Sequence, residues 1–196
     1  MTPTLPSIVA ASGLSTRMGT SKALLEVEGR TFLARILDAL RAGGGDPILV
    51  VVRDPDGPEA SEIRLRGGRP ILNPDPSPGP ISSLQAGLLA LPEGTEGVLF
   101  SPVDHPFFSP DTVRRLIKTF HATGAPLVAP SFKGRRGHPV LFGNEVFSEL
   151  LGPDLLEGAR TVVGRYLDRR RVVEVGDPGI LADINTPEDL KNHLPS

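Results

Sequence analysis

Short, almost wholly apolar runs recur along the chain, and they constrain its fold more than any other feature. Three of them cover residues 7–11, 48–52 and 98–100. Each is too short for a core helix and does not alternate with polar residues, which is the pattern of strands buried on both faces. Segments with helical periodicity separate these runs. We therefore expect an α/β fold, in which a mostly parallel central sheet lies between two layers of helices.

The predicted helices carry recognisable start and stop signals. Thr31 is placed to cap a helix that runs to about Ala42, where three glycines end it. Ser109-Pro110-Asp111 supplies an N-cap, a proline at the first helical position and an early acid. Further helices are predicted at residues 81–91, 145–151, 159–167 and from Thr186, and further strands at 70–72, 127–129, 139–142 and 172–175. Residues 53–69 lack a pattern and are expected to run irregularly over the surface.

The composition excludes several classes of function. The 196 residues suit a single domain, 1–196, and the net charge of −2 gives no general basic field for nucleic acid. The absence of cysteine excludes disulfides, thiolate metal centres and a cysteine nucleophile. No apolar run is long enough to cross a membrane, and the first residues lack the features of a signal peptide. A cytoplasmic protein without nucleic-acid or membrane partners is expected.

A loop of small residues follows the first predicted strand and offers a cradle for phosphate. Residues 10–22 contain two glycines, which let backbone N–H groups turn toward an anion, together with Arg17 and Lys22. The arginine can hold phosphate oxygens in a fork and the lysine supplies a point charge. The segment is neither a P-loop nor a dinucleotide fingerprint. A solvated surface loop is the alternative, but its position directly after a strand favours a ligand site.

Polar residues that could bind a ligand also follow two other predicted strands. Asn73 and the Gly79 loop precede a predicted helix, where Ser82 and Ser83 could contact a base edge or a phosphate. A proline-rich loop that merely caps a core helix is an equal alternative. Asp104 follows the strand at residues 98–100, and a carboxylate there is suited to hold Mg²⁺ against a triphosphate, although aspartate is also common in turns. In a parallel sheet these loops should converge on one crevice.

The residues of the first loop carry a family resemblance. Ala10 to Lys22 resembles the Leu-Ala-Ala-Gly-x-Ser-x-Arg-Met-Gly-x-x-Lys signature of pyrophosphorylase-type nucleotidyltransferases. It is more closely similar to the molybdenum-cofactor cytidylyl- and guanylyltransferases, the MobA and MocA type. The positions in register are Gly13, Ser15, Arg17, Met18, Gly19 and Lys22. The resemblance implies a Rossmann-like three-layer sandwich of the nucleotide-diphospho-sugar transferase type.

Further segments match the same family in order, from Ile8 to Leu190. Asp104-His105-Pro106 resembles its Asp-x-Pro motif, and residues 134–142 resemble its Gly-x-x-Gly-His-Pro-Val-Leu-Phe segment. Residues 158–160 and 183–190 also have counterparts, although Asn185 stands where cytidylyltransferases more often carry aspartate. Residues 79–81 resemble guanylyltransferases, whereas residues 82–88 resemble cytidylyltransferases. These segments therefore do not distinguish CTP from GTP as the nucleotide substrate.

The resemblance implies a role for each matching residue. Catalysis falls to Arg17, Lys22 and Asp104, with Mg²⁺ as cofactor, held by Asp104, Asp183 and Asn185. Nucleotide binding falls to Ala10, Ala11, Ser12, Gly13, Ser15, Arg17, Lys22, Asn73, Gly79, Ser82 and Ser83. Binding of the phosphorylated acceptor falls to His105, Arg136, His138 and Arg160. A solvated turn is the alternative for the arginines near residue 135, and simple packing is the alternative for His105.

These residues together indicate an enzyme that moves CMP or GMP from a nucleoside triphosphate to a phosphorylated small molecule and releases pyrophosphate. By resemblance, the acceptor is molybdopterin, and the protein is a monomer or a weak homo-oligomer. A sugar phosphate or phosphoalcohol acceptor is one alternative. A nucleotide-binding homologue without catalysis is another, for which Asn185 is a hint. A hydride-transferring enzyme is disfavoured, because the dinucleotide fingerprint is absent.

Overall fold

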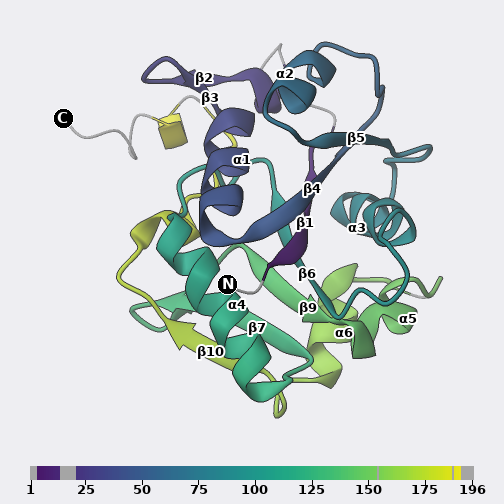
Figure 1. Cartoon of the computed structure of the whole chain (residues 1–196), viewed down its shortest axis with the longest axis vertical. Coiled ribbons are helices and arrows are strands. Elements are labelled where there is room, and N and C mark those ends of the chain that lie inside the picture. The colour runs from purple at the N-terminus through teal and green to yellow at the C-terminus, as the bar shows by residue number, and fades with distance from the viewer. Residues whose placement is uncertain (1–3, 14–20, 154, 187, 191–196) are drawn as a thin grey trace.

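A twisted sheet forms the centre of the molecule. The structure, a computed structural model, describes residues 4–13, 21–153, 155–186 and 188–190. The strands follow the order β10-β7-β9-β6-β1-β4-β5, and β8 pairs with β7 (Figure 1). Their bounds are β1 (Leu5–Ala10), β4 (Gly45–Val52), β5 (Arg69–Leu72), β6 (Gly97–Pro102), β7 (Leu127–Phe132), β8 (Arg135–Arg136), β9 (Val140–Gly143) and β10 (Arg171–Glu174).

The pairing of these strands is mostly parallel, as the sequence predicts. β1 pairs in parallel with β4 and β6, β4 with β5, and β7 with β10. The exception is β9, which lies antiparallel between β6 and β7. The short connection through β8 leaves no room for the crossover helix that a parallel strand requires, so β9 returns antiparallel to β7.

Helices cover both faces of the sheet and complete three layers. α1 (Phe32–Gly43) and α4 (Pro110–Thr123) lie on one face, and α3 (Pro80–Leu89), α5 (Phe147–Leu150) and α6 (Ala159–Arg165) lie on the other (Figure 1). Neighbouring residues of the central strand β1 serve both layers. Val9 packs into the first apolar cluster and Ile8 into the second, and both are fully buried. The three-layer α/β sandwich is therefore confirmed.

The predicted caps explain where the two long helices begin. The Oγ1 of Thr31 accepts a hydrogen bond from the N–H of Ala34 at 3.0 Å, and Gly44 ends α1 in the left-handed conformation. Ser109 caps α4 by accepting from the N–H of Thr112 at 3.2 Å, with Pro110 at the helix start. Both helices extend about as far as expected.

Several short elements were not expected from the sequence. α2 (Ala60–Leu65) lies within residues 53–69, so the expectation that this stretch is irregular is wrong in that part. β2 (Glu26–Val27) and β3 (Arg30–Thr31) form a separate hairpin. The remaining elements are the short helices η1 (Lys22–Leu24), η2 (Asn144–Val146) and η3 (Pro178–Leu181). Among the described helices, none combines the length and apolar character that a membrane span requires.

Close packing of α3 on β1 depends on a glycine. A Cβ at Gly87 would lie 2.6 Å from Cγ2 of Ile8, which is fully buried in the central strand. Gly87→Ala is expected to lower the free energy of unfolding by about 1–3 kcal/mol, because the core must shift to admit a methyl group. Denaturant unfolding measures this change.

The matched control lies in another helix of the same layer. A Cβ at Gly164 in α6 would meet nothing within 4 Å. Gly164→Ala is expected to leave stability unchanged or to raise it by up to about 1 kcal/mol, since alanine favours helix more than glycine does. Equal stability of Gly87→Ala and the unmodified protein would contradict the packing argument.

Candidate active site

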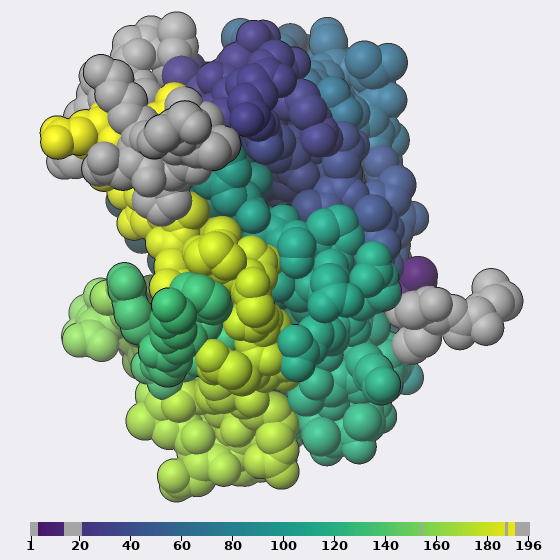
Figure 2. Space-filling view, turned by 90° about the vertical axis from the view of Figure 1, so that its left-hand side faces the viewer, coloured from purple at the N-terminus to yellow at the C-terminus, as the bar shows by residue number. Residues whose placement is uncertain are grey.

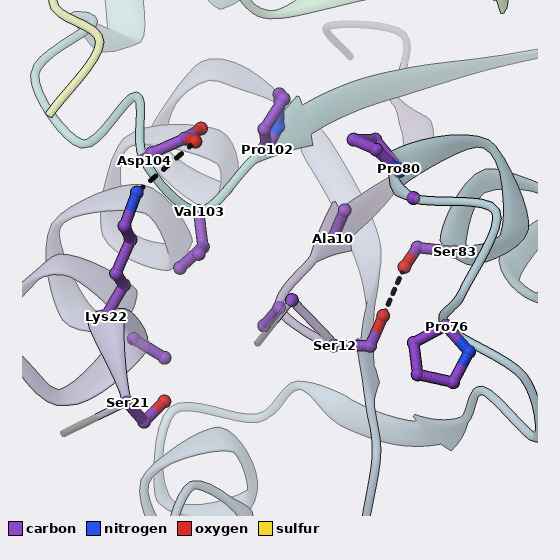
Figure 3. A pocket seen from close by; sticks show the side chains of 14 residues that line it. Ala10, Ser12, Ser21, Lys22, Pro76, Pro80, Ser83, Pro102, Val103 and Asp104 are labelled. Carbon is purple, nitrogen blue, oxygen red and sulfur yellow. Dashed lines mark hydrogen bonds and ion pairs between the residues drawn. The ribbon is translucent and has the colours of Figure 1, made fainter. Parts of the chain in front are cut away.

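Loops at the carboxyl edge of the sheet converge on one cavity, as expected. Its lining comprises residues 10–13 and 21–23, residues 76, 79, 80 and 83, and residues 102–104 (Figure 3). The first group follows β1, the second lies between β5 and the first turns of α3, and the third follows β6. Backbone hydrogen bonds join these segments, for example from the N–H of Val103 to the carbonyl of Ala10 at 3.0 Å. This cavity is named the nucleotide cavity below.

A buried polar network ties the first two loops together. The hydroxyls of Ser12 and Ser83 are hydrogen bonded at 2.6 Å (Figure 3). The amide of Asn73 donates to Ser12 at 3.0 Å and to Ser82 at 2.9 Å. All four residues are buried. Because their polar atoms satisfy one another, these side chains fix the shape of the cavity wall, while the predicted base contacts of Ser82 and Ser83 stay predictions.

Glycines leave the backbone accessible on this wall. Gly79 has φ +84° at the start of α3, a conformation that other residues adopt only with strain. A Cβ at Gly13 or at Gly79 would meet no atom of the described residues within 4 Å. The main chain at both positions therefore has open space beside it, into which a phosphate or ribose could fit.

Lys22 contacts residues from two distant parts of the chain. Its Nζ donates to Oδ1 of Asn185 at 2.7 Å. The same Nζ lies 3.9 Å from Oδ2 of Asp104 (Figure 3). The amide of Asn185 in turn donates to Oδ1 of Asp183 at 2.6 Å, and the N–H of Ile184 donates to the carbonyl of Asp104 at 2.9 Å. Lys22 and Asp104 thus share one cavity, as the nucleotide hypothesis requires.

Asp104, His105 and Asp183 form a group suited to a divalent cation. One ligand atom from each lies within 4.8 Å of the other two. Burial raises the pKa of the Asp104 carboxyl, and Asp183 raises it further, while His105 and Lys22 oppose this shift. Oδ1 of Asp104 is buried and has no hydrogen-bond partner among the described residues. A cation would satisfy this oxygen, so the donor set fits a metal.

One further residue predicted as a metal ligand lies next to this group. The amide oxygen of Asn185 accepts a hydrogen bond from Lys22, and its role as a ligand stays a prediction. His105, which was predicted to bind the acceptor, lies beside the carboxylates. Its place directly after Asp104 was the only sequence signal for this. Burial lowers the pKa of the His105 ring, although Asp104 opposes this shift. The lowered pKa favours a neutral ring, whose nitrogen is available as a ligand.

A second histidine packs against the first in a tilted arrangement. The rings of His105 and His138 have centroids 4.5 Å apart and an interplanar angle of 49°. Burial, aided by His105, lowers the pKa of His138 to about 3. Nδ1 of both rings is buried without a hydrogen-bond partner in the described part of the chain. His138 is therefore neutral at physiological pH and would bind a ligand as a neutral donor or acceptor.

The lowered pKa of His138 predicts acid sensitivity. An unfolded histidine has a pKa near 6.5, so between about pH 6.5 and pH 3 the unfolded chain binds a proton that the folded chain does not. This contribution to stability is therefore lost as the pH falls. His138→Gln should reduce the stability lost between pH 7 and pH 5 by about 2 kcal/mol, measured by denaturant unfolding at each pH.

The control for this measurement is His121→Gln, because His121 is exposed on α4. It should leave the pH dependence of unfolding unchanged. An identical pH dependence for His138→Gln and the unmodified protein would show that folding does not lower the pKa of His138.

The four residues predicted to bind the acceptor line one further cavity of about 570 Å³. These are His105, Arg136, His138 and Arg160. A larger cavity of about 710 Å³ lies alongside and shares His138 and Arg160 with it. The two predicted residues Ser15 and Arg17 lie outside the described residues, so their roles stay predictions.

The fold and this site define the class of the protein. A three-layer sandwich with a glycine-rich loop, a lysine and a carboxylate group at the carboxyl edge of its sheet is the arrangement expected of a nucleotidyltransferase. A family model described as "MobA-like NTP transferase domain" matches residues 7–171. The chain belongs to this family, which confirms both the resemblance and the enzyme class.

Individual relatives agree with this assignment. The chain is 32% identical to a molybdenum cofactor guanylyltransferase of Rhizobium meliloti (strain 1021), over 95% of this chain and 88% of that protein. The crystal structure of Rv0371c from Mycobacterium tuberculosis H37Rv superposes with a TM-score of 0.77 at 29% identity, covering 98% of each chain. Rv0371c has also been solved in complex with manganese, at 26% identity, with a TM-score of 0.76 and coverage of 96% of this chain and 97% of that one.

Proposed function

We propose that this enzyme transfers GMP from GTP to the phosphate of a molybdopterin-type acceptor and releases pyrophosphate, with Mg²⁺ as cofactor. The observation that carries the proposal is the meeting of Lys22 and Asp104 at 3.9 Å in the wall of the nucleotide cavity. The choice of GTP is supported by relatives named as guanylyltransferases at about 30% identity. The choice of a molybdopterin-type acceptor is supported by the names of the same relatives.

The reaction requires positioning more than covalent chemistry. An oxygen of the acceptor phosphate attacks the α-phosphorus in line, and the bond to the bridging oxygen of pyrophosphate breaks. A phosphate monoester is already ionised at neutral pH, so no side chain is needed as general base. Lys22 is placed to neutralise charge that grows on the α-phosphate, and Arg17 is proposed to hold the outer phosphates.

Asp104 and Asp183 would hold the metal, with His105 beside them. A bound Mg²⁺ supplies positive charge that offsets the charge of the triphosphate. The hydrogen bond between Asn185 and Lys22 leaves this amide a positioning role. It orients the lysine toward the cavity. Through its contact with Asp183, it also holds the lysine in a fixed position relative to the two acids.

Pyrophosphate release tests the proposal directly. The four nucleoside triphosphates are each combined with molybdopterin and with a panel of sugar phosphates and phosphoalcohols, in the presence of Mg²⁺. The expected result is fastest release with GTP and molybdopterin. Faster release with CTP would overturn the base assignment, and faster release with a sugar phosphate would overturn the acceptor. Nucleotide binding without release for any acceptor would identify a non-catalytic homologue.

A further inference from the structure

The two carboxylates of the metal group lie in two segments that run side by side. Asp104 begins residues 104–109, which lead from β6 to α4. Asp183 lies near the end of residues 177–184, which include η3. The N–H of Ile184 donates to the carbonyl of Asp104 at 2.9 Å, so the segments are bonded directly beside both carboxylates. The relative position of the carboxylates therefore depends on how these segments are held together.

Asp177 joins the far ends of the same segments. Its Oδ2 accepts hydrogen bonds from the N–H of Ser109 at 2.7 Å and from the hydroxyl of Thr112 at 2.6 Å. Its Oδ1 accepts from the N–H of Gly179 at 3.0 Å and thereby caps η3. The first turn of α4 also presents the positive end of a helix dipole, which favours a carboxylate at this place. Asp177 therefore does more than cap η3, because its second oxygen binds the start of α4.

Close backbone contacts hold η3 on two sides. A Cβ at Gly179 would collide with the carbonyl oxygen of Phe107. On the other side, a Cβ at Gly137 would collide with the carbonyl oxygen of Ile180, a fully buried residue of the first apolar cluster. Figure 2 shows the yellow part of the chain, which includes η3, between the teal α4 and the green β7–β8 turn. The position of this closely packed element is thus tied to the carboxylate that caps it.

We propose that Asp177 is a positioning residue, which sets the spacing between Asp104 and Asp183 and thereby the affinity of this group for a divalent cation. This rests on the proposed function and adds to it a residue that lines none of the three cavities. Only Ala182 separates η3 from Asp183, so a displacement of η3 also displaces this ligand. Residues that orient metal ligands without touching the metal commonly contribute about 10–100-fold to its affinity.

Titration of the full, nucleotide-free chain with Mn²⁺, followed by electron paramagnetic resonance, tests the proposal. Asp177→Asn should raise the Kd for Mn²⁺ by about tenfold, because an amide has a single acceptor oxygen and cannot bind both η3 and α4. Asp111→Asn is the matched control, since Asp111 lies in the first turn of α4 but pairs with Arg114. This control should leave the Kd for Mn²⁺ unchanged.

Variants of Thr112 test the same link from α4. Thr112→Val should raise the Kd for Mn²⁺ by about threefold, since one donor to the Asp177 carboxylate is lost. Thr112→Ser keeps a hydroxyl and should bind Mn²⁺ like the unmodified protein. The double variant Asp177→Asn/Thr112→Val should bind no more weakly than Asp177→Asn alone, because both changes break one link. An unchanged Kd in Asp177→Asn and in Thr112→Val, with the ion lost in Asp104→Ala, would overturn the proposal and leave the metal group in place.

Steady-state kinetics separates positioning from a purely structural role. At saturating GTP and molybdopterin, Asp177→Asn should raise the Mg²⁺ concentration for half-maximal pyrophosphate release by about tenfold, with a smaller change in kcat at saturating Mg²⁺. A lower denaturant midpoint with an unchanged Mg²⁺ dependence would make Asp177 purely structural and overturn the proposal. If no acceptor supports turnover while Mn²⁺ binding still depends on Asp177, the positioning role stands and the proposed function fails.

Discussion

Lys22→Ala is expected to lower kcat for pyrophosphate release by roughly 10²–10³-fold, which is the usual cost of removing one charge that stabilises a transition state. The ammonium lies in the wall of the nucleotide cavity, where charge would develop on the α-phosphate. Its contacts include a hydrogen bond to the neutral Asn185 amide and an approach of 3.9 Å to Oδ2 of Asp104, and both belong to the site itself. The free energy of unfolding should therefore change far less than the activation free energy.

The measurement compares kcat at saturating GTP and molybdopterin with the denaturant midpoint of the same variant. Lys118→Ala is the matched control, because Lys118 is exposed on α4 and lies outside the three cavities. It should retain full turnover. Turnover near that of the unmodified protein in Lys22→Ala would remove this lysine from the mechanism.

Asp104→Ala should abolish magnesium-dependent turnover, with a loss on the order of 10³-fold or more, because metal charge contributes several kcal/mol to such transition states. The carboxyl belongs to the group of three ligands, and its buried Oδ1 has no hydrogen-bond partner in the described chain. Burial also raises the pKa of Asp104. A cation must displace the proton of a carboxyl with a raised pKa, so metal affinity should fall as the pH is lowered.

Titration with Mn²⁺, followed by electron paramagnetic resonance, measures binding independently of turnover. Asp104→Ala should lose the bound ion, whereas Asp111→Ala should keep it, since Asp111 pairs with Arg114 on the surface of α4. Full activity of Asp104→Ala at ordinary Mg²⁺ concentrations would show that the metal site lies elsewhere.

The parts of the fold that follow from local chemistry were predictable. Apolar runs gave the central strands, and the caps at Thr31 and Ser109 gave the starts of two helices. α2 was missed because only Ala60 and Ile63 of its six residues are buried, too few to produce a periodic pattern. The insertion of β9 between β6 and β7 depends on long-range pairing, which no local pattern encodes.

The same distinction applies to the site. Lys22 and Asp104 lie in the segments that follow β1 and β6, and they could be assigned to one crevice because parallel strands end at one edge. The resemblance placed Asn185 at the same site, but its hydrogen bond to Lys22 joins residues 163 positions apart and could not be predicted. Nor could the mutual pairing of Ser12 and Ser83 be foreseen, because a serine in a loop carries no sign of where its hydroxyl points.

The attachment of residues 183–185 across the active site has a thermodynamic consequence. Ile184 is bonded to the main chain of Asp104, and Asn185 to the side chain of Lys22, so detachment of this segment and loss of the lysine's orientation are one event. A ligand that binds only the attached state must, by linkage, lower the population of the detached state in proportion to its saturation. Substrate occupancy and the attachment of residues 183–185 are therefore two readouts of a single equilibrium.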